Sequence, residues 1–274
     1  MITWAKMKDQ REVQKIWKTC FGDPNDYIHF FIKYHLPLER CLAYKKDGKI
    51  VSMLFLLPSR CFYQGKEYPV QYVYAAATLP AFRKQGLMER LLAYTREIAQ
   101  HSQMLFTCLK PANEDLYRYY GKFGYCTAFH TTHLSITYQE EVANLSFKSA
   151  SADELFALRE QSFPVGLRWD REMFAFVLRD WQMANGEYLL FQDGYCLART
   201  DGSKVLCKEV VPGRYTIEQI GNALCARYGL QETAFSLPWN GDKTEDGGMI
   251  QPVSSAIDCQ KFEQACPYFN LMLD

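Results

Sequence analysis

The chain has 274 residues, and its 31 Lys+Arg and 31 Asp+Glu give a formal net charge of zero. No global field therefore attracts a nucleic acid or an anionic membrane surface, and we expect neither as a partner. The length exceeds the roughly 100 to 200 residues of one domain, so two modules are predicted. A hydrophobic share of 48% and an aromatic share of 15% predict packed cores and exclude a disordered chain.

Targeting and membrane signals are missing from the expected places. The segment Met1–Trp17 is interrupted by charged side chains throughout, which excludes the apolar region of a secretory signal. The longest apolar run, Ile50–Leu57, is far shorter than the roughly 20 residues that a membrane span needs. We therefore expect a soluble, cytoplasmic protein.

The cysteine and histidine patterns do not indicate a metal site. Among ten cysteines the closest spacing is Cys259 to Cys266, and no C-x-x-C pair exists. In a chain this long without a secretory signal, we expect reduced and mostly buried thiols. The five histidines show no ligand spacing either, so no metal cofactor is predicted.

The first half begins with two predicted helices and a hairpin. Apolar residues of Val13–Cys20 fall at helical spacing, and Asp23-Pro24 is typical of the start of a second helix. Two strands, Cys41–Tyr44 and Ile50–Leu57, are separated by a turn with an Asp-Gly signal. A further strand is predicted over Val70–Thr78, which is rich in alanine at its end.

The rest of the first half alternates helix and strand. The 3.6-residue period of Leu87–Gln100 predicts a helix, followed by a short buried strand over Met104–Leu109. A helix is then predicted over Asn113–Phe123, ended by Gly124. The alternation of Tyr125–Tyr138 predicts a long strand.

The polar stretch Gln139–Asp153 is the predicted domain boundary. Beyond it the pattern gives helix, helix, strands, helix, strand, with a Thr216/Gln219 capping box before the last helix. The expected elements are Asp153–Phe163, Asp170–Met183, Tyr188–Phe191, Tyr195–Arg199, Val205–Val211, a helix through Tyr228, and Thr233–Leu237. This order repeats that of the first half, which suggests a degenerate duplication.

The segment Ala75–Gln100 carries the chemistry. An apolar strand runs into a basic, glycine-containing turn and directly into a helix, and the turn reads Arg83, Lys84, Gln85, Gly86, Leu87, Met88. Unpaired N–H groups and the dipole of such a helix start attract phosphate, while Gly86 permits a tight turn. Taken alone, a solvated basic loop explains the same pattern.

Two motifs give the turn a family context. Arg83-x-x-Gly86-x-Met88 resembles the R/Q-x-x-G-x-G/A pyrophosphate loop of GNAT acetyltransferases. Across one strand, the run from Asn113 through Tyr120 to Tyr125 resembles their N-x-x-A-x-x-x-Y-x-x-x-G-F/Y element. The string Tyr120-Gly121-Lys122-Phe123-Gly124-Tyr125 and the loop ending in Gly86-Leu87-Met88 resemble the Eis-type branch, in which a degenerate second GNAT module follows the first.

The resemblance implies a fold and a domain plan. The fold class would be α/β with a mixed sheet (α+β), built as tandem GNAT-like modules of which the second is degenerate. Residues 1–140 would form the catalytic domain, and residues 145–274 the degenerate domain with a C-terminal tail strand. The likeness is to the first two Eis-type modules only, because the chain is too short to hold the whole third domain of that branch.

The resemblance also assigns site residues. Ala76, Ala77 and Thr78 would bind the pantetheine arm of acetyl-CoA through their backbone, and Arg83 to Met88 would cradle the pyrophosphate. Asn113 would hydrogen-bond the cofactor arm, and Tyr120 would be the general acid. Each of these could instead be an ordinary sheet or core residue. Two departures from the loop pattern are Met88 and Lys84, which stand where smaller residues are usual.

The general base is not evident from the sequence. A lysine-like amine has a pKa near 10.4, so something must accept its proton at neutral pH. In Eis-type enzymes the C-terminal carboxylate reaches into the first module, and we expect the apolar tail to bring Asp274 near Tyr120. The alternative is a tail that only completes the second module's sheet.

The predicted function is transfer of an acetyl or other acyl group from acetyl-CoA to a primary amine of a small molecule, peptide or lysine. The alternative is an acyl-CoA-binding regulatory module without turnover. The aromatic side chains of the first two helices and a late strand suggest an acceptor with an apolar body, or only core packing. They are Trp17, Phe21, Tyr27, Phe30, Tyr34 and Phe129. A homo-oligomer is possible.

Overall fold

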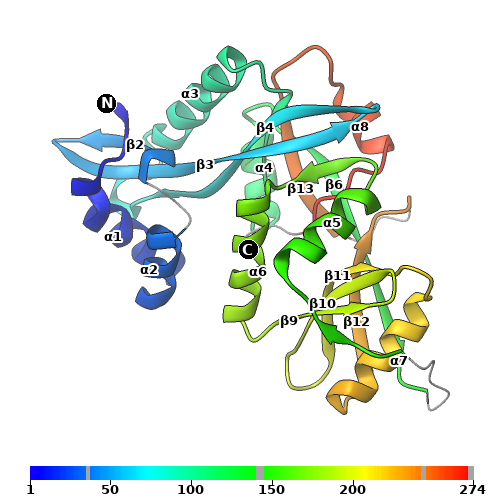
Figure 1. The fold of residues 1–274 in the computed structure, drawn as a ribbon. Helices are drawn as coiled ribbons and strands as arrows, with labels where there is room; N and C mark the ends of the chain where they lie inside the picture. The colour runs from blue at the N-terminus through cyan, green and yellow to red at the C-terminus, as the bar shows by residue number, and fades with distance from the viewer. Residues whose placement is uncertain (35–37, 140–144, 242–244, 271–274) are drawn as a thin grey trace. The chain divides into compact units, whose positions relative to one another are not determined.

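The computed structural model describes residues 1–34, 38–139, 145–241 and 245–270. The protein is a mixed α/β structure (Figure 1), so the predicted fold class is confirmed. The chain divides into two compact units, whose segments alternate along the sequence. The first unit comprises Met1–Arg60, Tyr68–Cys126 and Met249–Cys259, and the second comprises Cys61–Glu67, Thr127–Gly248 and Gln260–Asp274. The predicted boundary partly coincides with residues 140–144, which lie outside the described residues.

The first unit is built on a mixed sheet. Its strands, in their order across the sheet, are β1 (Ile2–Trp4), β2 (Cys41–Lys46), β3 (Lys49–Tyr63), β4 (Lys66–Thr78), β5 (Phe106–Leu109) and β13 (Glu245–Pro252). Neighbours β1, β2 and β3 pair antiparallel, β4 and β5 pair parallel, and β5 and β13 pair antiparallel. Strands β3, β4 and β13 each also contribute residues to the second unit.

Strand β13 was not predicted, although it completes the first unit's sheet. Its residues Met249 to Pro252 pair with Leu109 to Phe106 of β5. The glycine-rich, charged start of this strand lacks the alternation that indicates a strand in sequence. Its pairing partner also lies far earlier in the chain, so local patterns carry no sign of it.

Helices of the first unit follow the predicted pattern. They are α1 (Gln10–Phe21), α2 (Asn25–Tyr34), α3 (Leu87–His101) and α4 (Glu114–Gly121), with short 3-10 turns η1 (Met7–Asp9), η2 (Leu38–Arg40) and η3 (Pro80–Phe82). Helix α1 buries Val13, Ile16 and Trp17 and ends at Gly22, which adopts a left-handed conformation. Helix α8 (Cys259–Gln264) begins at the unit's last residue and was also not predicted.

The hairpin of β3 and β4 is longer than the sequence indicates. Strand β3 continues to Tyr63 rather than ending at Leu57, and a two-residue turn of Gln64 and Gly65 follows. Both turn residues have positive φ, 50° and 74°, as a type I′ turn requires. Because Gln-Gly is a weaker turn signal than Asn-Gly, sequence patterning places the end of the strand too early.

The second unit contains a similar set of elements. Its strands are β6 (Cys126–Thr137), β7 (Lys148–Ser149), β8 (Gly166–Arg168), β9 (Glu187–Phe191), β10 (Gly194–Thr200), β11 (Val205–Val211) and β12 (Glu232–Pro238). Its helices are α5 (Ala152–Ser162), α6 (Arg171–Met183) and α7 (Ile217–Tyr228). The sheet order is β6-β12-β11-β10-β9-β7, and only β11 and β12 pair parallel among these neighbours.

A buried charge cluster fixes the C-terminal segment in the second unit. Arg159 of α5 and Glu209 of β11 form an ion pair, with the guanidinium Nε 3.2 Å from the nearer carboxylate oxygen. Hydroxyls of Tyr195 and Tyr268 donate to the same carboxylate at 2.5 and 2.7 Å. The peptide N–H and C=O of Tyr268 bond to Val165 and Leu167. Burial beside this carboxylate raises the pKa of both tyrosines well above 10, so both remain neutral donors.

The cysteines depart from the expectation in one place. Cys126 and Cys259 form a disulfide within the first unit, so the prediction of reduced thiols is wrong for this pair in the structure. The other eight cysteines are free, and all of them except Cys20 and Cys266 are buried, as expected. The two bonded residues are 133 positions apart, which is why sequence spacing gives no sign of the bond.

Candidate functional site

The end of β4 separates from β5 in the first unit. Among the described residues, the parallel pairing joins Gln71 with Thr107 and Tyr72 with Cys108, whereas β4 continues to Thr78. Ala75 has φ of 48°, a left-handed conformation that is rare for a residue with a Cβ and that bends the strand. Backbone groups of β4 beyond this bend are therefore not used by β5.

Ser52 of β3 holds the separated end of β4 in place. Its buried hydroxyl lies 3.1 Å from the carbonyl oxygen of Ala77 and 2.8 Å from the hydroxyl of Thr78. The Thr78 carbonyl also accepts from the Arg83 guanidinium at 3.1 Å. No sequence pattern assigned Ser52 a role. The signal that could have identified it is a small polar residue in the middle of an otherwise apolar strand.

The turn after β4 presents an uncapped helix start. Turn η3 leads into Lys84 and Gly86, which have φ of 59° and 70°. Gly86 is the N-cap of α3, and no side chain caps that helix. Because the first N–H groups of a helix have no partner inside it, they are directed at whatever occupies this position. Arg83, Lys84, Gln85 and Gly86 are exposed, so the turn is accessible to a ligand.

A carboxylate lies beside the helix start. A Cβ placed on Gly86 would meet the Glu89 carboxylate at 3.6 Å. The same carboxylate, together with burial as the larger cause, raises the pKa of Tyr119. An acidic side chain in the first turn stabilises the helix dipole when no anion is bound.

Leu87 and Met88 are the first two residues of α3, and their side chains are buried. Met88 packs in an apolar cluster with Leu91 and Leu92 of the same helix and does not fill the turn. Its bulk, which departs from the family pattern, is therefore directed into the core rather than toward the exposed turn.

Asn113 begins helix α4. Its side-chain oxygen accepts from the Leu116 N–H at 3.1 Å, so the residue acts as an N-cap. The remaining amide group belongs to an exposed residue. A capping role and a ligand contact through the amide nitrogen are compatible, because they use different atoms.

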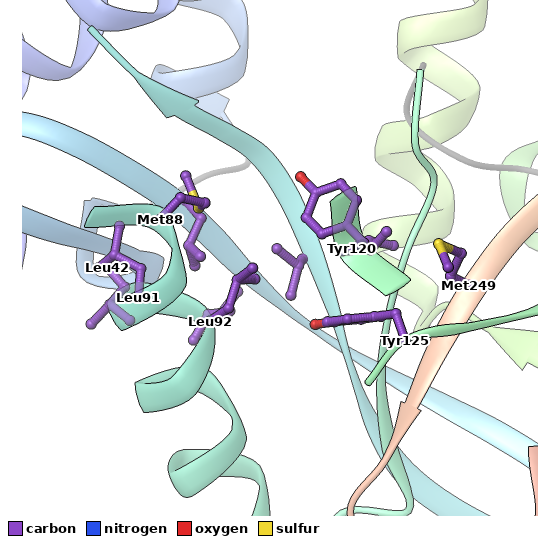
Figure 2. Packing of buried hydrophobic residues seen from close by; sticks show 11 residues of the cluster. Leu42, Met88, Leu91, Leu92, Tyr120, Tyr125 and Met249 are labelled. Carbon is purple, nitrogen blue, oxygen red and sulfur yellow. The ribbon is translucent and has the colours of Figure 1, made fainter. Parts of the chain in front are cut away.

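Tyr120 lies in the last turn of α4. The residue is 8% exposed and packs in the cluster that contains Met88, Leu109, Tyr125 and Met249. Figure 2 shows the Tyr120 and Tyr125 hydroxyls both directed toward the side of this cluster where α3 lies. Burial, and to a lesser extent Tyr119, raises the pKa of Tyr120 above 10. Its hydroxyl has no hydrogen-bond partner among the described residues.

Tyr125 plays a different part from Tyr120. Its hydroxyl pairs with the Thr107 hydroxyl at 2.9 Å in the core, and its N–H bonds to the Tyr120 carbonyl at 3.4 Å. The two rings meet edge to face at 5.8 Å between centroids. Tyr125 therefore fixes the end of α4, whereas the Tyr120 hydroxyl remains available to a ligand.

The structure thus brings several predicted residues into one unit. Ala76, Met88 and Tyr120 contribute to one apolar cluster, and the exposed turn from Arg83 to Gly86 precedes the helix that supplies Met88. Asp274 lies outside the described residues. Among the described residues, no group of three or more His, Cys, Asp and Glu could hold a metal ion.

The aromatic residues of α1 and α2 are mainly core. Trp17 is buried and donates from its indole to Asp23 at 2.7 Å. Its ring packs within about 6 Å of Phe31, Phe55 and Tyr74, by centroid distances of 5.3, 5.8 and 5.9 Å. Tyr27 and Phe30 are half-buried and Phe21 is 45% exposed, whereas the side chain of Tyr34 lies outside the described residues.

The candidate site therefore combines three features. They are a separated parallel strand pair, an uncapped helix start and a tyrosine with an available hydroxyl. In sequence, residues 2–128 match the family described as acetyltransferase (GNAT) domain. The resemblance inferred from the two motifs is confirmed for these residues.

Solved structures extend the likeness to both units. A GCN5-related N-acetyltransferase from Anabaena variabilis has a TM-score of 0.74 at 17% identity, over 93% of this chain and 73% of that chain. Eis1 from Mycobacterium abscessus has a TM-score of 0.71 at 14% identity, over 93% of this chain and 74% of that chain. A tandem GNAT protein from the clavulanic acid biosynthesis pathway has a TM-score of 0.52 at 12% identity, over 91% and 97%. At such identities, the likeness shows the fold.

Neither a curated relative nor a membrane-spanning helix is found. No curated protein sequence matches the chain significantly. Across the described residues, no helix combines the length and apolar character needed to cross a membrane.

Proposed function

We propose that the protein is an acetyl-CoA-dependent N-acetyltransferase that transfers the acetyl group to a primary amine of a small molecule, peptide or lysine. The observation that carries the proposal is the combination, within the first unit, of an uncapped α3 start and a buried tyrosine with an available hydroxyl. Binding of acyl-CoA alone would not need the second feature. Residues 145–274 are proposed as a degenerate GNAT-like module without chemistry of its own.

The turn from Arg83 to Met88 is proposed to hold the pyrophosphate. Its backbone N–H groups and the positive end of the α3 dipole favour an anion at this position. Lys84 supplies a mobile cation, while Arg83 already contacts the Thr78 carbonyl and so orders the turn. The Glu89 carboxylate would have to move away from the helix start when a phosphate binds.

The pantetheine arm is proposed to lie along the separated end of β4. Backbone groups of Ala76, Ala77 and Thr78 follow the bend at Ala75, beyond the pairing with β5. The arm would complete the interrupted sheet hydrogen bonding on that side. Asn113 could contact the same arm through its amide nitrogen, because its oxygen caps α4.

The proposed reaction is direct attack of a neutral amine on the thioester carbonyl. The C–N bond forms and the nitrogen gives its proton to water. The C–S bond then breaks, and CoA leaves as a thiolate that takes a proton from water. A thiol has a pKa near 8.5, whereas the pKa of Tyr120 is raised above 10. Full transfer of the tyrosine proton to the leaving thiolate is therefore uphill, and a hydrogen bond from Tyr120 to the developing charge is the main effect.

The pKa of Tyr120 also sets an expectation for pH. The phenol donates only while it is protonated, and its raised pKa keeps it protonated through the whole range below pH 10. The acceptor amine must be neutral to attack, so kcat/KM should rise with pH until the amine is deprotonated. No fall caused by Tyr120 is expected below pH 10.

The test is a thiol-release assay with acetyl-CoA and a panel of amines, comparing the wild type with Tyr120→Phe. Loss of the hydroxyl should lower kcat by about 100-fold, the lower range for a positioned acid or hydrogen-bond donor. Tyr119→Phe is the matched control, because it removes a hydroxyl from the adjacent residue of α4 and should leave kcat within about threefold.

Either proposal can fail in this assay. Full activity of Tyr120→Phe would exclude the tyrosine role while leaving the enzyme intact. Tight acetyl-CoA binding without turnover of any amine would instead favour an acyl-CoA-binding regulatory module.

A further inference from the structure

Among the described residues, one disulfide is present, and it joins two half-buried residues of the first unit. Cys126 is the first residue of β6 and directly follows Tyr125, and Cys259 is the first residue of α8. Their Cα atoms are 6.5 Å apart, within the range that a disulfide spans. Both side chains retain partial exposure, so a dissolved reagent can reach the bond.

The bond restrains the segment that contains the second half of β13. Met249 to Pro252 pair with β5, and the N–H groups of Val253 and Ser254 bond to the Leu105 carbonyl at 3.2 Å each. Cys259 follows shortly after this stretch. The disulfide therefore links this segment covalently to the part of the chain that follows α4.

Residues of the same segment also contact the candidate site. Met249 belongs to the apolar cluster that contains Tyr120. The Gln251 side-chain amide donates to the Phe123 carbonyl, at the turn between α4 and Tyr125. A loosening of β13 would therefore remove packing and one hydrogen bond from the end of the helix that carries Tyr120.

We propose that Cys126 and Cys259 are a thiol–disulfide switch that controls the order of β13 and, through it, the position of Tyr120. The disulfide state holds Met249 and Gln251 against α4, and the dithiol state leaves them more mobile there. The effect on acyl transfer rests on the function proposed above, whereas the effect on the order of β13 does not.

The reacting partner is a small-molecule disulfide of the glutathione type. One cysteine thiolate attacks the reagent, releases one thiol and forms a mixed disulfide. The second cysteine thiolate then attacks the protein sulfur, forming the Cys126–Cys259 bond and releasing a second thiol. The protein loses two protons and two electrons, and the reagent gains them. Excess dithiol reverses both steps.

The reduced state should loosen β13 without expelling it. The Cys126 sulfur lies 3.5 Å from the Ile250 carbonyl oxygen, a distance at which a thiol can donate a weak hydrogen bond. The pairing of β13 with β5 also remains available. We therefore expect greater mobility of residues 249–258 rather than unfolding.

The other cysteines compete little for the reagent. Six of the eight free thiols are buried, and burial raises the pKa of Cys41, Cys61 and Cys207 above the ordinary thiol value, which disfavours their reactive thiolates. Cys266 is half-exposed and belongs to the second unit, so it provides a matched control for the switch.

The test measures hydrogen exchange of the peptide covering residues 249–258 in protein treated with oxidised glutathione or with dithiothreitol. Alkylation and mass spectrometry establish the state of Cys126 and Cys259 in each sample. Exchange should be at least about tenfold slower in the disulfide state, because a covalent tie opposes local opening. A protein with Cys126→Ser and Cys259→Ser should behave as reduced in both buffers, and Cys266→Ser should respond like the wild type.

The outcomes separate this proposal from the proposed function. Equal exchange in two samples that differ in the Cys126–Cys259 bond, or failure of the bond to form, would overturn the switch. If exchange responds and some amine is acetylated, reduction should also lower kcat several-fold, and an unchanged kcat would overturn the link to Tyr120. If exchange responds but no amine is acetylated, the proposed function fails while control of β13 stands.

Discussion

Each unit contains a strand–helix–strand crossover, and the two crossovers differ in how the first N–H groups of their helices are used. In the first unit, β4, α3 and β5 form a parallel crossover, and in the second unit β11, α7 and β12 do the same. Helix α3 begins at Gly86 without a side-chain cap. Helix α7 begins at Thr216, which forms a reciprocal capping box with Gln219. The N–H groups that are available in the first unit are therefore used internally in the second.

The separated strand ends differ in the same way. β11 and β12 pair from Val205 with Thr233 to Cys207 with Phe235. The next residues on each strand, Lys208 and Ser236, both accept from the side-chain amide of Asn270, which lies 3.1 Å from the Ser236 carbonyl oxygen. The protein's own C-terminal segment thus takes the place between these strands.

This comparison supports the proposal of a cofactor site in the first unit alone, because the two crossovers differ in the polar backbone groups that the protein itself uses. The first unit leaves the helix start without a side-chain cap and the end of β4 without pairing to β5, and it contains Tyr120. The second unit satisfies both with Thr216, Gln219 and Asn270. The buried pair of Arg159 and Glu209 then fixes the segment that supplies Asn270.

The largest expected effect comes from removing the anchor of that segment. Glu209→Ala leaves the Arg159 charge buried without its partner and removes the acceptor of the Tyr195 and Tyr268 hydroxyls. We expect a loss of about 3 to 5 kcal/mol in the free energy of unfolding, measured by urea denaturation of the second unit's signal. Asp193→Ala is the control, because its pair with Arg214 is exposed and should contribute about 1 kcal/mol or less. Similar losses for both variants would contradict a structural role of the buried pair.

A smaller loss in the free energy of unfolding is expected when only the hydrogen-bond donor between β11 and β12 is removed. Asn270→Ala leaves the Lys208 and Ser236 carbonyls without their donor, which should cost about 1 to 3 kcal/mol. Calorimetric titration of the wild type should give one acetyl-CoA per chain, because α3 begins without a side-chain cap whereas Thr216 caps α7. Gln260→Ala, at an exposed position, should change neither quantity. Two equivalents bound by the wild type would break the comparison.

The smallest expected effect tests the open turn itself. Gly86→Ala places a Cβ on a residue with φ of 70°, so the turn is strained by about 1 kcal/mol. We expect acetyl-CoA binding to weaken about tenfold, which corresponds to 1.4 kcal/mol. Gly229→Ala is matched, since Gly229 ends α7 with φ of 66° and open space around it. It should lower stability similarly and leave the acetyl-CoA affinity unchanged, and a loss of affinity in both variants would count against the turn as the binding element.

Local sequence determined the elements that carry the site. Gly86 after a basic turn and the 3.6-residue period beyond it predict the start of α3, and the structure begins that helix at Leu87. Likewise, Thr216 and Gln219 predict the capping box of α7 that the structure contains. These signals are readable because the interactions involved lie within a few residues of one another. The spacing of Tyr120 from Asn113 is local for the same reason.

Tertiary structure decided which backbone groups those elements leave unpaired. The bend at Ala75, the insertion of β13 beside β5, the Cys126–Cys259 bond and the placement of Asn270 between β11 and β12 all join residues far apart in sequence or depend on such pairing. No local pattern encodes a partner that lies 34 or more residues away along the chain. The sequence alone therefore predicted the turn that we propose as the cofactor loop, and only the packing of distant segments distinguished the two crossovers.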